Sequence, residues 1–300
     1  MAAAGGGRSV QRIITSIKTT EGGGFKINRP FPTRALDQFD PWLMLDEMGP
    51  IEYGPGEALG APDHPHRGFE TITYLLDGAS THKDSAGLTG SMKAGDVQWM
   101  TAGSGVVHCE MPSEDILKEG GRVHGFQIWL NLPKRDKWIQ PRYQDTRSED
   151  IPVVETAEKS VWVKVIAGES MGTKAVIETR TPILFLHCKL QPGASFTQEV
   201  PSSYNAFAYL IEGEGVFGNG KHATAKQAVF FERDGDSVTV KNDETAKETL
   251  SLLLLAGTPL NEPIARYGPF VMNTQEEIQQ AFTDFRAGRM GKIKHPEAAR

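Results

Sequence analysis

The sequence predicts an all-β protein in which two barrels or sandwiches stand in tandem, with one helix near the C-terminus. Three observations lead to this fold class: short apolar segments that recur along the chain, glycine-rich breaks between them, and a faint internal repeat. The chain has 300 residues, with 32 glycines and 18 prolines. That length exceeds one typical domain, and such glycine and proline counts suit many short strands joined by turns.

The apolar segments have the length and the content of Val, Ile, Phe and Tyr that favour strands. Breaks such as GAS, AGLTG, KAGD, EGEG and GNGK separate them. A further strand is expected through Val10–Ile17, after a short N-terminal tail. The predicted strands include Glu70–Leu76, Val97–Met100, Gly125–Leu130, Val161–Ile166, Ile183–Leu190, Phe207–Ile211 and Leu250–Ala256.

The internal repeat has two landmarks. YLLDG at 74–78 matches YLIEG at 209–213, and GDV at 95–97 matches GDS at 235–237. Two landmarks in the same order predict a duplicated all-β unit, with the polar segment Tyr143–Pro152 as the link. The expected boundaries are a tail and first strand at 1–23, a first barrel at 24–145, a second barrel at 150–260 and a C-terminal segment at 261–300.

One helix is expected over about 275–287. Thr274 is a candidate N-cap and Glu277 follows three residues later, which is the capping-box pattern. Apolar residues then recur on one helix face, and Gly288 suits the helix end. The residues of this face are Ile278, Ala281, Phe282 and Phe285.

Composition excludes several classes of protein. The net charge is -6 and the isoelectric point about 5.8, which argues against direct binding of nucleic acid. Two cysteines do not form a disulfide framework, so a reducing compartment is expected. No run of 18 apolar residues is present, so no membrane span is expected. The start of the chain is interpreted as a tail rather than a transit peptide.

The first barrel carries two pairs of candidate metal ligands. His64 and His66 lie in DHPHRGFE, and His108 and Glu110 lie in GSGVVHCEMP. Residues i and i+2 share one face of a strand, so both pairs can point into one barrel. Imidazole with carboxylate suits first-row transition metals better than calcium or magnesium. The alternative is a polar loop whose histidines bond one another and the backbone at the barrel rim.

Four segments of the chain resemble the pirin family of the cupin superfamily: DHPHRGFETITYLL, GDVQWMTAGSGVVHCEMP, HGFQIWLNLP and YGPFVMNTQEEI. The resemblance runs from about Gly24 to Gly288. It implies tandem cupin barrels, also called the double-stranded β-helix or jelly roll, with one Fe²⁺ in the first barrel only. Other divalent transition metals are compatible with the same ligands. Position by position, the resemblance assigns the metal to His64, His66, His108 and Glu110.

Other polar residues are expected around this site. Glu70 occupies the carboxylate position of the wider cupin motif, so it should lie beside the metal without binding it, or serve as an alternative ligand. His124 and Gln127 are expected to donate to the ligands, although a hydrogen-bonded strand histidine is an equal interpretation of His124. His82 follows a turn and is expected to be exposed.

The second barrel is expected to hold no metal. His187 and His222 have no partner ligand at a suitable spacing, so both are interpreted as structural or exposed. The two landmarks of the repeat lie 135 and 140 residues apart. Adding 135 to the positions of His64 and His66, and 140 to those of His108 and Glu110, gives residues that are not a ligand set, namely Glu199, Pro201, Glu248 and Leu250.

The resemblance implies two functions of different class. The first is an oxidoreductase of the quercetin 2,3-dioxygenase type, acting on a flavonol-like molecule and O₂, in which Glu110 takes the proton of the flavonol hydroxyl. The second is a co-regulator that binds a transcription factor without turnover and responds to the oxidation state of the iron. The acidic isoelectric point suits a basic protein partner. No Lys/Arg import cluster is present, so the cytoplasm, the nucleus or both are expected, and the chain is expected to be a monomer.

Overall fold

The computed structural model describes residues 6–21 and 23–295, and it contains two compact antiparallel β-barrels. Of these residues, 6–17, 29–41 and 149–260 form the second barrel, and all others form the first barrel. The N-terminal segment expected at 1–23 is therefore divided between the barrels. The C-terminal segment, as far as residue 295, belongs to the first barrel.

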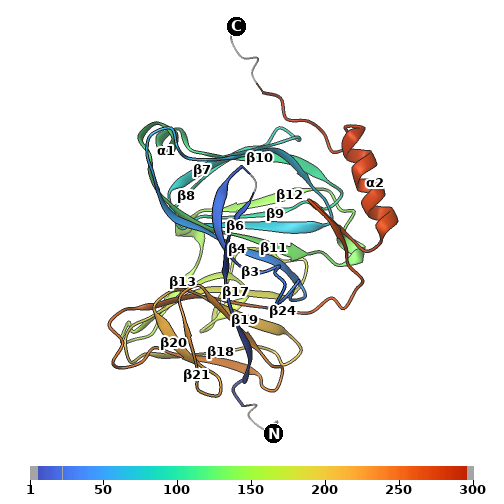
Figure 1. Ribbon diagram of the computed structural model, residues 1–300. Coiled ribbons are helices and arrows are strands. Elements are labelled where there is room, and N and C mark those ends of the chain that lie inside the picture. The colour runs from blue at the N-terminus through green and yellow to red at the C-terminus, as the bar shows by residue number, and fades with distance from the viewer. Residues whose placement is uncertain (1–5, 22, 296–300) are drawn as a thin grey trace. The chain divides into compact units, whose positions relative to one another are not determined.

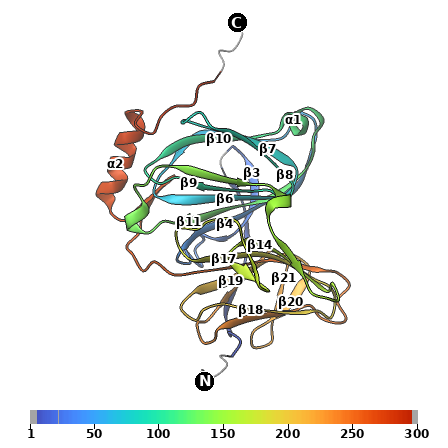
Figure 2. The ribbon, with the colours of Figure 1, turned by 180° about the vertical axis from the view of Figure 1, so that it is seen from behind.

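The first barrel consists of a larger and a smaller sheet that enclose its interior (Figures 1 and 2). The larger sheet has the order β12 (Arg142–Thr146), β9 (Val97–Thr101), β6 (Phe69–Asp77), β11 (Gly121–Asn131), β4 (Trp42–Tyr53), β3 (Phe25–Phe31) and β2 (Ile17–Glu21). The smaller sheet has the order β5 (Ala61–His66), β10 (Val106–Pro112), β7 (Ala79–Asp84) and β8 (Thr89–Lys93). The hairpin β25 (Ala265–Tyr267) and β26 (Phe270–Met272) and the helices α1 (Glu114–Glu119) and α2 (Gln275–Arg286) complete this barrel, with a 3-10 turn at Lys134–Asp136.

The second barrel repeats this arrangement. Its larger sheet has the order β1 (Val10–Thr15), β22 (Gln227–Phe231), β19 (Asn205–Glu212), β24 (Leu250–Gly257), β17 (Ile183–Leu190), β14 (Val161–Ala167) and β13 (Val153–Glu155). Its smaller sheet has the order β18 (Ser195–Glu199), β23 (Ser237–Lys241), β20 (Glu214–Phe217) and β21 (Lys221–Thr224). The short hairpin β15 (Glu169–Ser170) and β16 (Thr173–Lys174) and a 3-10 turn at Ser148–Asp150 complete the chain.

The strand predictions are confirmed. Each of the seven apolar segments lies within a strand, because segments of this length can be buried in a sheet on one face or both. The strand expected through Val10–Ile17 is two strands, β1 and β2, which meet at Ser16 and belong to different sheets. Among the described residues, no helix is long and apolar enough to span a membrane.

The two barrels share one strand order, which confirms the duplication but corrects one of its landmarks. Tyr74 on β6 pairs with Val97 on β9, and Tyr209 on the corresponding strand β19 pairs with Ala228 on β22. The first landmark therefore lies at equivalent positions. The second does not, because 95–96 precede β9 whereas 235–236 precede β23, the counterpart of β10. A Gly-Asp turn fits many strand ends, so its recurrence did not mark equivalence.

The helix α2 confirms the capping-box prediction. Thr274 accepts a hydrogen bond from the backbone of Glu277, and the Glu277 side chain accepts one from the backbone of Thr274. Ile278 and Ala281 are buried as expected, whereas Phe285 is partly exposed. The buried face also contains Asp284, which the apolar pattern did not reveal.

A buried lysine joins three segments of the first barrel. Lys137 Nζ donates to the carbonyl of Gly68 at 2.7 Å, to Oδ1 of Asn131 at 2.7 Å and to the carbonyl of Val271 at 3.0 Å. Three acceptors match the three protons of an ammonium group. Burial lowers the pKa of Lys137 to about 7, although Glu262 and Glu277 act in the opposite direction.

Replacing this lysine should destabilise the first barrel. Lys137→Met leaves three buried acceptors without a donor, so we expect a loss of about 3 kcal/mol or more in the free energy of unfolding, measured with urea. Lys118→Met, at an exposed position of α1, is the control and should change stability by less than about 0.5 kcal/mol.

The same pair of proteins tests the pKa of Lys137. The folded protein holds this proton more weakly than the unfolded chain, whose lysine pKa is about 10.4, so the unfolded chain binds more protons between pH 7 and 10. The stability of the wild type relative to Lys137→Met should therefore rise with pH across this range. A difference that does not change with pH would contradict the lowered pKa.

Candidate metal centre

Three histidines meet at one point inside the first barrel. His64 and His66 lie on β5 and His108 on the neighbouring strand β10, where His108 pairs directly with His64. The ring centroids are 4.3 to 5.0 Å apart. One nitrogen from each ring can be chosen so that all three lie within 4.8 Å of one another. The predicted convergence of these imidazoles is therefore present in the structure.

The hydrogen bonds of the rings leave lone pairs free. His64 Nδ1 lies 2.8 Å from the carbonyl of Pro62, which accepts its proton and leaves Nε2 as the free nitrogen. His66 Nδ1 and both nitrogens of His108 are buried and have no hydrogen-bond partner among the described residues. Each ring thus offers an uncommitted nitrogen.

Burial keeps two of these rings neutral. It lowers the pKa of His66 and of His108 well below the usual imidazole value, and the neighbouring imidazoles lower both further. His64 is the most exposed of the three. Neutral imidazole is the form that binds a metal, so His66 and His108 are ready to act as ligands at neutral pH.

The residues fit a transition-metal ion. A buried polar nitrogen without a partner costs roughly 1–3 kcal/mol, and three such atoms lie in this group. Imidazole–metal bonds of about 2.0–2.1 Å keep the ligands of one ion within about 4.2 Å of one another, close to the spacing found here. Imidazole suits iron, copper, nickel and zinc. A cation would satisfy one nitrogen of each ring.

The C-terminal segment anchors the turn that follows His66. Arg67 is buried; its Nε donates to the carbonyl of Ser104 at 2.7 Å and its guanidinium pairs with Asp284 of α2 at 2.7 Å. Gly68 adopts φ 88°, and a side chain there would collide with the carbonyl of Val271. Glycine is therefore required at this turn.

The same segment anchors the start of β10. The hydroxyl of Ser85 donates to the carbonyl of Met290 at 2.7 Å and accepts a bond from the backbone nitrogen of Val107 at 3.2 Å. Val107 also packs in an apolar cluster with Phe270, Met272, Ile278, Ala281 and Met290. Both ligand-bearing strands are thus fixed from outside the metal centre.

Glu110 lies outside the group of close ligand atoms. The pairing of β5 with β10 shifts between His108 and Glu110, because β5 carries one extra residue there, and such a bulge re-aims the side chains around it. The Glu110 carboxylate instead meets Thr73 of the larger sheet, with Oε1 at 3.1 Å from the hydroxyl. Its role as a fourth ligand stays a prediction.

The residues expected around the centre lie in different places. Gln127 contacts Thr73 at 2.8 Å and so lies next to Glu110. His124 is three residues from Gln127 on β11, hence on the opposite face, and its Nε2 bonds Glu47 at 2.9 Å. Glu70 alternates with the site-facing Phe69 on β6, points to the other face and accepts from Thr101 at 2.6 Å. Among the described residues, no carboxylate or imidazole on that face lies close enough to the three histidines to share a metal ion with them.

Two polar residues of the interior were missed from the sequence. His82 was expected to be exposed, but it is buried, and its Nε2 lies 2.9 Å from Asp145 Oδ2. Asp145 belongs to the segment expected to link the barrels, yet it lies on β12 at the edge of the larger sheet. His82 and Asp84, two residues apart on β7, are both buried and share its inward face, which the polar segment ASTHKD does not reveal by apolar alternation.

The second barrel has no equivalent centre in the part of the chain that is described. Its strands β18 and β23 correspond to β5 and β10, and neither carries a histidine; the inward positions of β23 are the apolar Val238 and Val240. The predicted counterparts of His108 and Glu110, Glu248 and Leu250, lie outside β23 because the second repeat landmark was misplaced. His187 is buried against Ser251 and His222 is exposed, as expected.

Two barrels with one strand order, of which the first holds a three-histidine group, define a bicupin with a candidate metal centre. Comparisons identify the family. Residues 24–130 match the family described as Pirin, and residues 185–291 match the family described as Pirin C-terminal cupin domain.

Relatives and solved structures agree with this match. The chain is 41% identical over 290 residues to human Pirin, covering 96% of this chain and 95% of that protein. It is 43% identical over 285 residues to a Pirin-like protein of Solanum lycopersicum, covering 95% and 93%. A solved quercetin 2,3-dioxygenase from Acinetobacter baumannii is 37% identical, with a TM-score of 0.89 over 96% of this chain and 100% of that chain. The chain belongs to the pirin family.

Metal content should depend on His108. We expect about one transition-metal ion per chain by elemental analysis, and almost none after His108→Ala. An ion at a free concentration of 100 times its Kd adds about 2.7 kcal/mol of stability, so a chelator should lower the Tm of the wild type only. His187→Ala, in the second barrel, is the control and should keep the ion. Unchanged metal content in His108→Ala would place the ion elsewhere.

Proposed function

We propose that this chain is a metal-dependent dioxygenase of the quercetin 2,3-dioxygenase type, with one Fe²⁺ in the first barrel. The observation that carries the proposal is the group of three imidazoles, two of which have buried nitrogens without a hydrogen-bond partner. The 37% identity to the Acinetobacter protein described as quercetin 2,3-dioxygenase supports the choice of reaction. The substrates would be a flavonol-like molecule and O₂.

The three histidines would hold the iron. A bound ferrous ion supplies the one-electron chemistry with dioxygen that amino-acid side chains lack. All other contributions proposed here come from side chains of the first barrel, which bind the substrate, accept its proton and exclude water.

Glu110 is the proposed base. The Thr73 hydroxyl holds one carboxylate oxygen at 3.1 Å, which leaves the other free to accept the proton of a substrate hydroxyl. The same Thr73 hydroxyl lies 2.8 Å from Oε1 of Gln127, so its one proton is shared between the Gln127 oxygen and the Glu110 carboxylate. Thr73 and Gln127 would therefore set the orientation of the base.

An aromatic wall beside the histidines suits a planar substrate. The rings of Phe69 and Trp129 are 4.4 Å apart, and Trp129 meets His66 edge to face at 5.3 Å. Flat apolar side chains favour a flat aromatic ligand and keep water away from it. A flavonol has this shape.

Glu110 can be tested by oxygen consumption. Iron-loaded protein should consume O₂ when quercetin is added, and Glu110→Gln should lower kcat by about 10² to 10⁴, the usual contribution of a general base. Thr73→Val should cause a smaller loss, because the base remains but is less well oriented. Glu114→Gln, at an exposed position that pairs only with Lys118, is the control.

Two results would contradict the proposal at different points. No oxygen consumption by the iron-loaded wild type would remove the dioxygenase function. Full activity of Glu110→Gln would keep the function and remove Glu110 as its base. The co-regulator role, a transcription-factor partner and a nuclear or cytoplasmic location stay predictions from the sequence.

A further inference from the structure

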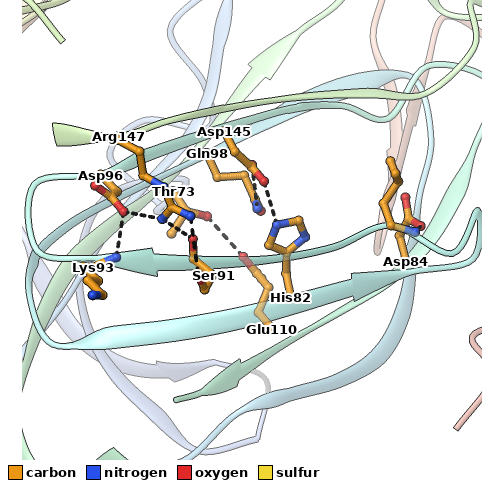
Figure 3. A network of polar contacts seen from close by, with 11 residues as sticks. Thr73, His82, Asp84, Ser91, Lys93, Asp96, Gln98, Glu110, Asp145 and Arg147 are labelled. Carbon is orange, nitrogen blue, oxygen red and sulfur yellow. Dashed lines mark hydrogen bonds and ion pairs between the residues drawn. The ribbon is translucent and has the colours of Figure 1, made fainter. Parts of the chain in front are cut away.

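A second polar cluster lies in the first barrel beside Glu110. His82 on β7 pairs in register with Glu110 on β10, so their side chains are neighbours on one face of the smaller sheet. Figure 3 shows the two side chains next to each other, with the His82 ring directed toward Asp145. His82 is buried, and its Nε2 lies 2.9 Å from Asp145 Oδ2.

The pair with Asp145 decides which nitrogen of His82 carries the proton. A carboxylate only accepts, so the proton lies on Nε2 of His82. Gln98 Nε2 holds the other carboxylate oxygen of Asp145 at 3.1 Å and fixes its orientation. Nδ1 of His82 is consequently a bare acceptor, and it is buried without a hydrogen-bond partner among the described residues.

The neighbouring strands are shaped around this pair. Gly90 on β8 faces His82 in register, and a Cβ at residue 90 would overlap Nε2 of His82 and lie 2.7 Å from Asp145 Oδ2. Tyr143 stacks on the His82 ring, with centroids 5.2 Å apart and an interplanar angle of 26°. The imidazole is therefore held in one orientation by contacts on several sides, which leaves Nδ1 as its one unsatisfied polar atom.

We propose that Nδ1 of His82 accepts a hydrogen bond from a hydroxyl group of the substrate, which makes His82 a specificity-determining residue of the first barrel. His82 and Glu110 are adjacent acceptors on one face, with Cβ atoms about 5 Å apart, so they select a ligand with two donors. The class of ligand is a planar polyphenol with at least one hydroxyl besides the one that Glu110 deprotonates. This inference rests on the proposed function, and its test separates the two.

The test compares two probes. Quercetin carries several hydroxyls and 3-hydroxyflavone carries one, and their Kd values are measured by fluorescence with iron-loaded full-length protein in the absence of oxygen. We expect the preference of the wild type for quercetin to fall about five- to tenfold in His82→Phe, the usual value of one hydrogen bond. Gly90→Ala should have the same effect, because it displaces the His82–Asp145 pair.

Two conservative variants distinguish binding from folding. In His82→Asn the amide oxygen takes the place of Nδ1, so most of the preference should remain. In His82→Gln the amide reaches toward Asp145 instead, so the preference should be lost. These two variants decide the question even when His82→Phe does not fold. His222→Phe, at an exposed position of the second barrel, is the control.

Equal preferences in wild type and His82→Gln would overturn the inference, and so would the failure of both probes to bind the wild type. Oxygen consumption is measured separately. A preference that depends on His82 without any oxygen consumption would refute the proposed function and leave this binding site standing. Oxygen consumption together with a preference for quercetin that His82→Gln leaves unchanged would support the proposed function and refute this inference.

Discussion

The first barrel depends on keeping three imidazoles close together, two of them buried with nitrogens that have no hydrogen-bond partner. Such an arrangement opposes folding, because buried polar atoms lose water without gaining a hydrogen bond. Strands that are fixed before the metal arrives make the arrangement possible. The anchoring contacts described above lie just outside the histidines, at the turn after His66 and at the start of β10. The described part of the C-terminal segment therefore supports the histidine group without contributing an imidazole or carboxylate to it.

The two barrels differ in how many polar side chains their interiors contain. The interior of the second barrel is filled by apolar side chains, including Val163, Leu186, Leu210, Val229 and Leu254. The first barrel has the same strand order, yet polar side chains such as Thr73, His82 and Glu110 occupy positions between its sheets. One repeat gains its stability from its own core. The other also buries large apolar side chains, such as Trp42, Trp99 and Phe126, and places its polar side chains in a separate part of its interior.

The parts that could be predicted from the sequence are those that local patterns determine. The strand segments, the capping box of α2 and the two histidines on β5 are all read from neighbours a few residues apart. Asp145 could not be found in this way, since a polar edge strand looks like a linker until its partner strand is known. Asp284 was missed because it is a charged residue on a helix face expected to be apolar, where Arg67 compensates its burial. Both depend on partners far along the chain.

The surroundings of Glu110 follow from the two strands that flank β10. On one side, β5 carries one extra residue, so Glu110 pairs with Ala61 instead of Pro62. On the other side, the pairing with β7 is regular and sets His82 directly opposite Glu110. The carboxylate meets Thr73 of the larger sheet and stays outside the histidine group. One strand thus places an imidazole in the histidine group and, two residues later, a carboxylate in a different polar environment, which is the separation that a base distinct from the metal ligands would need.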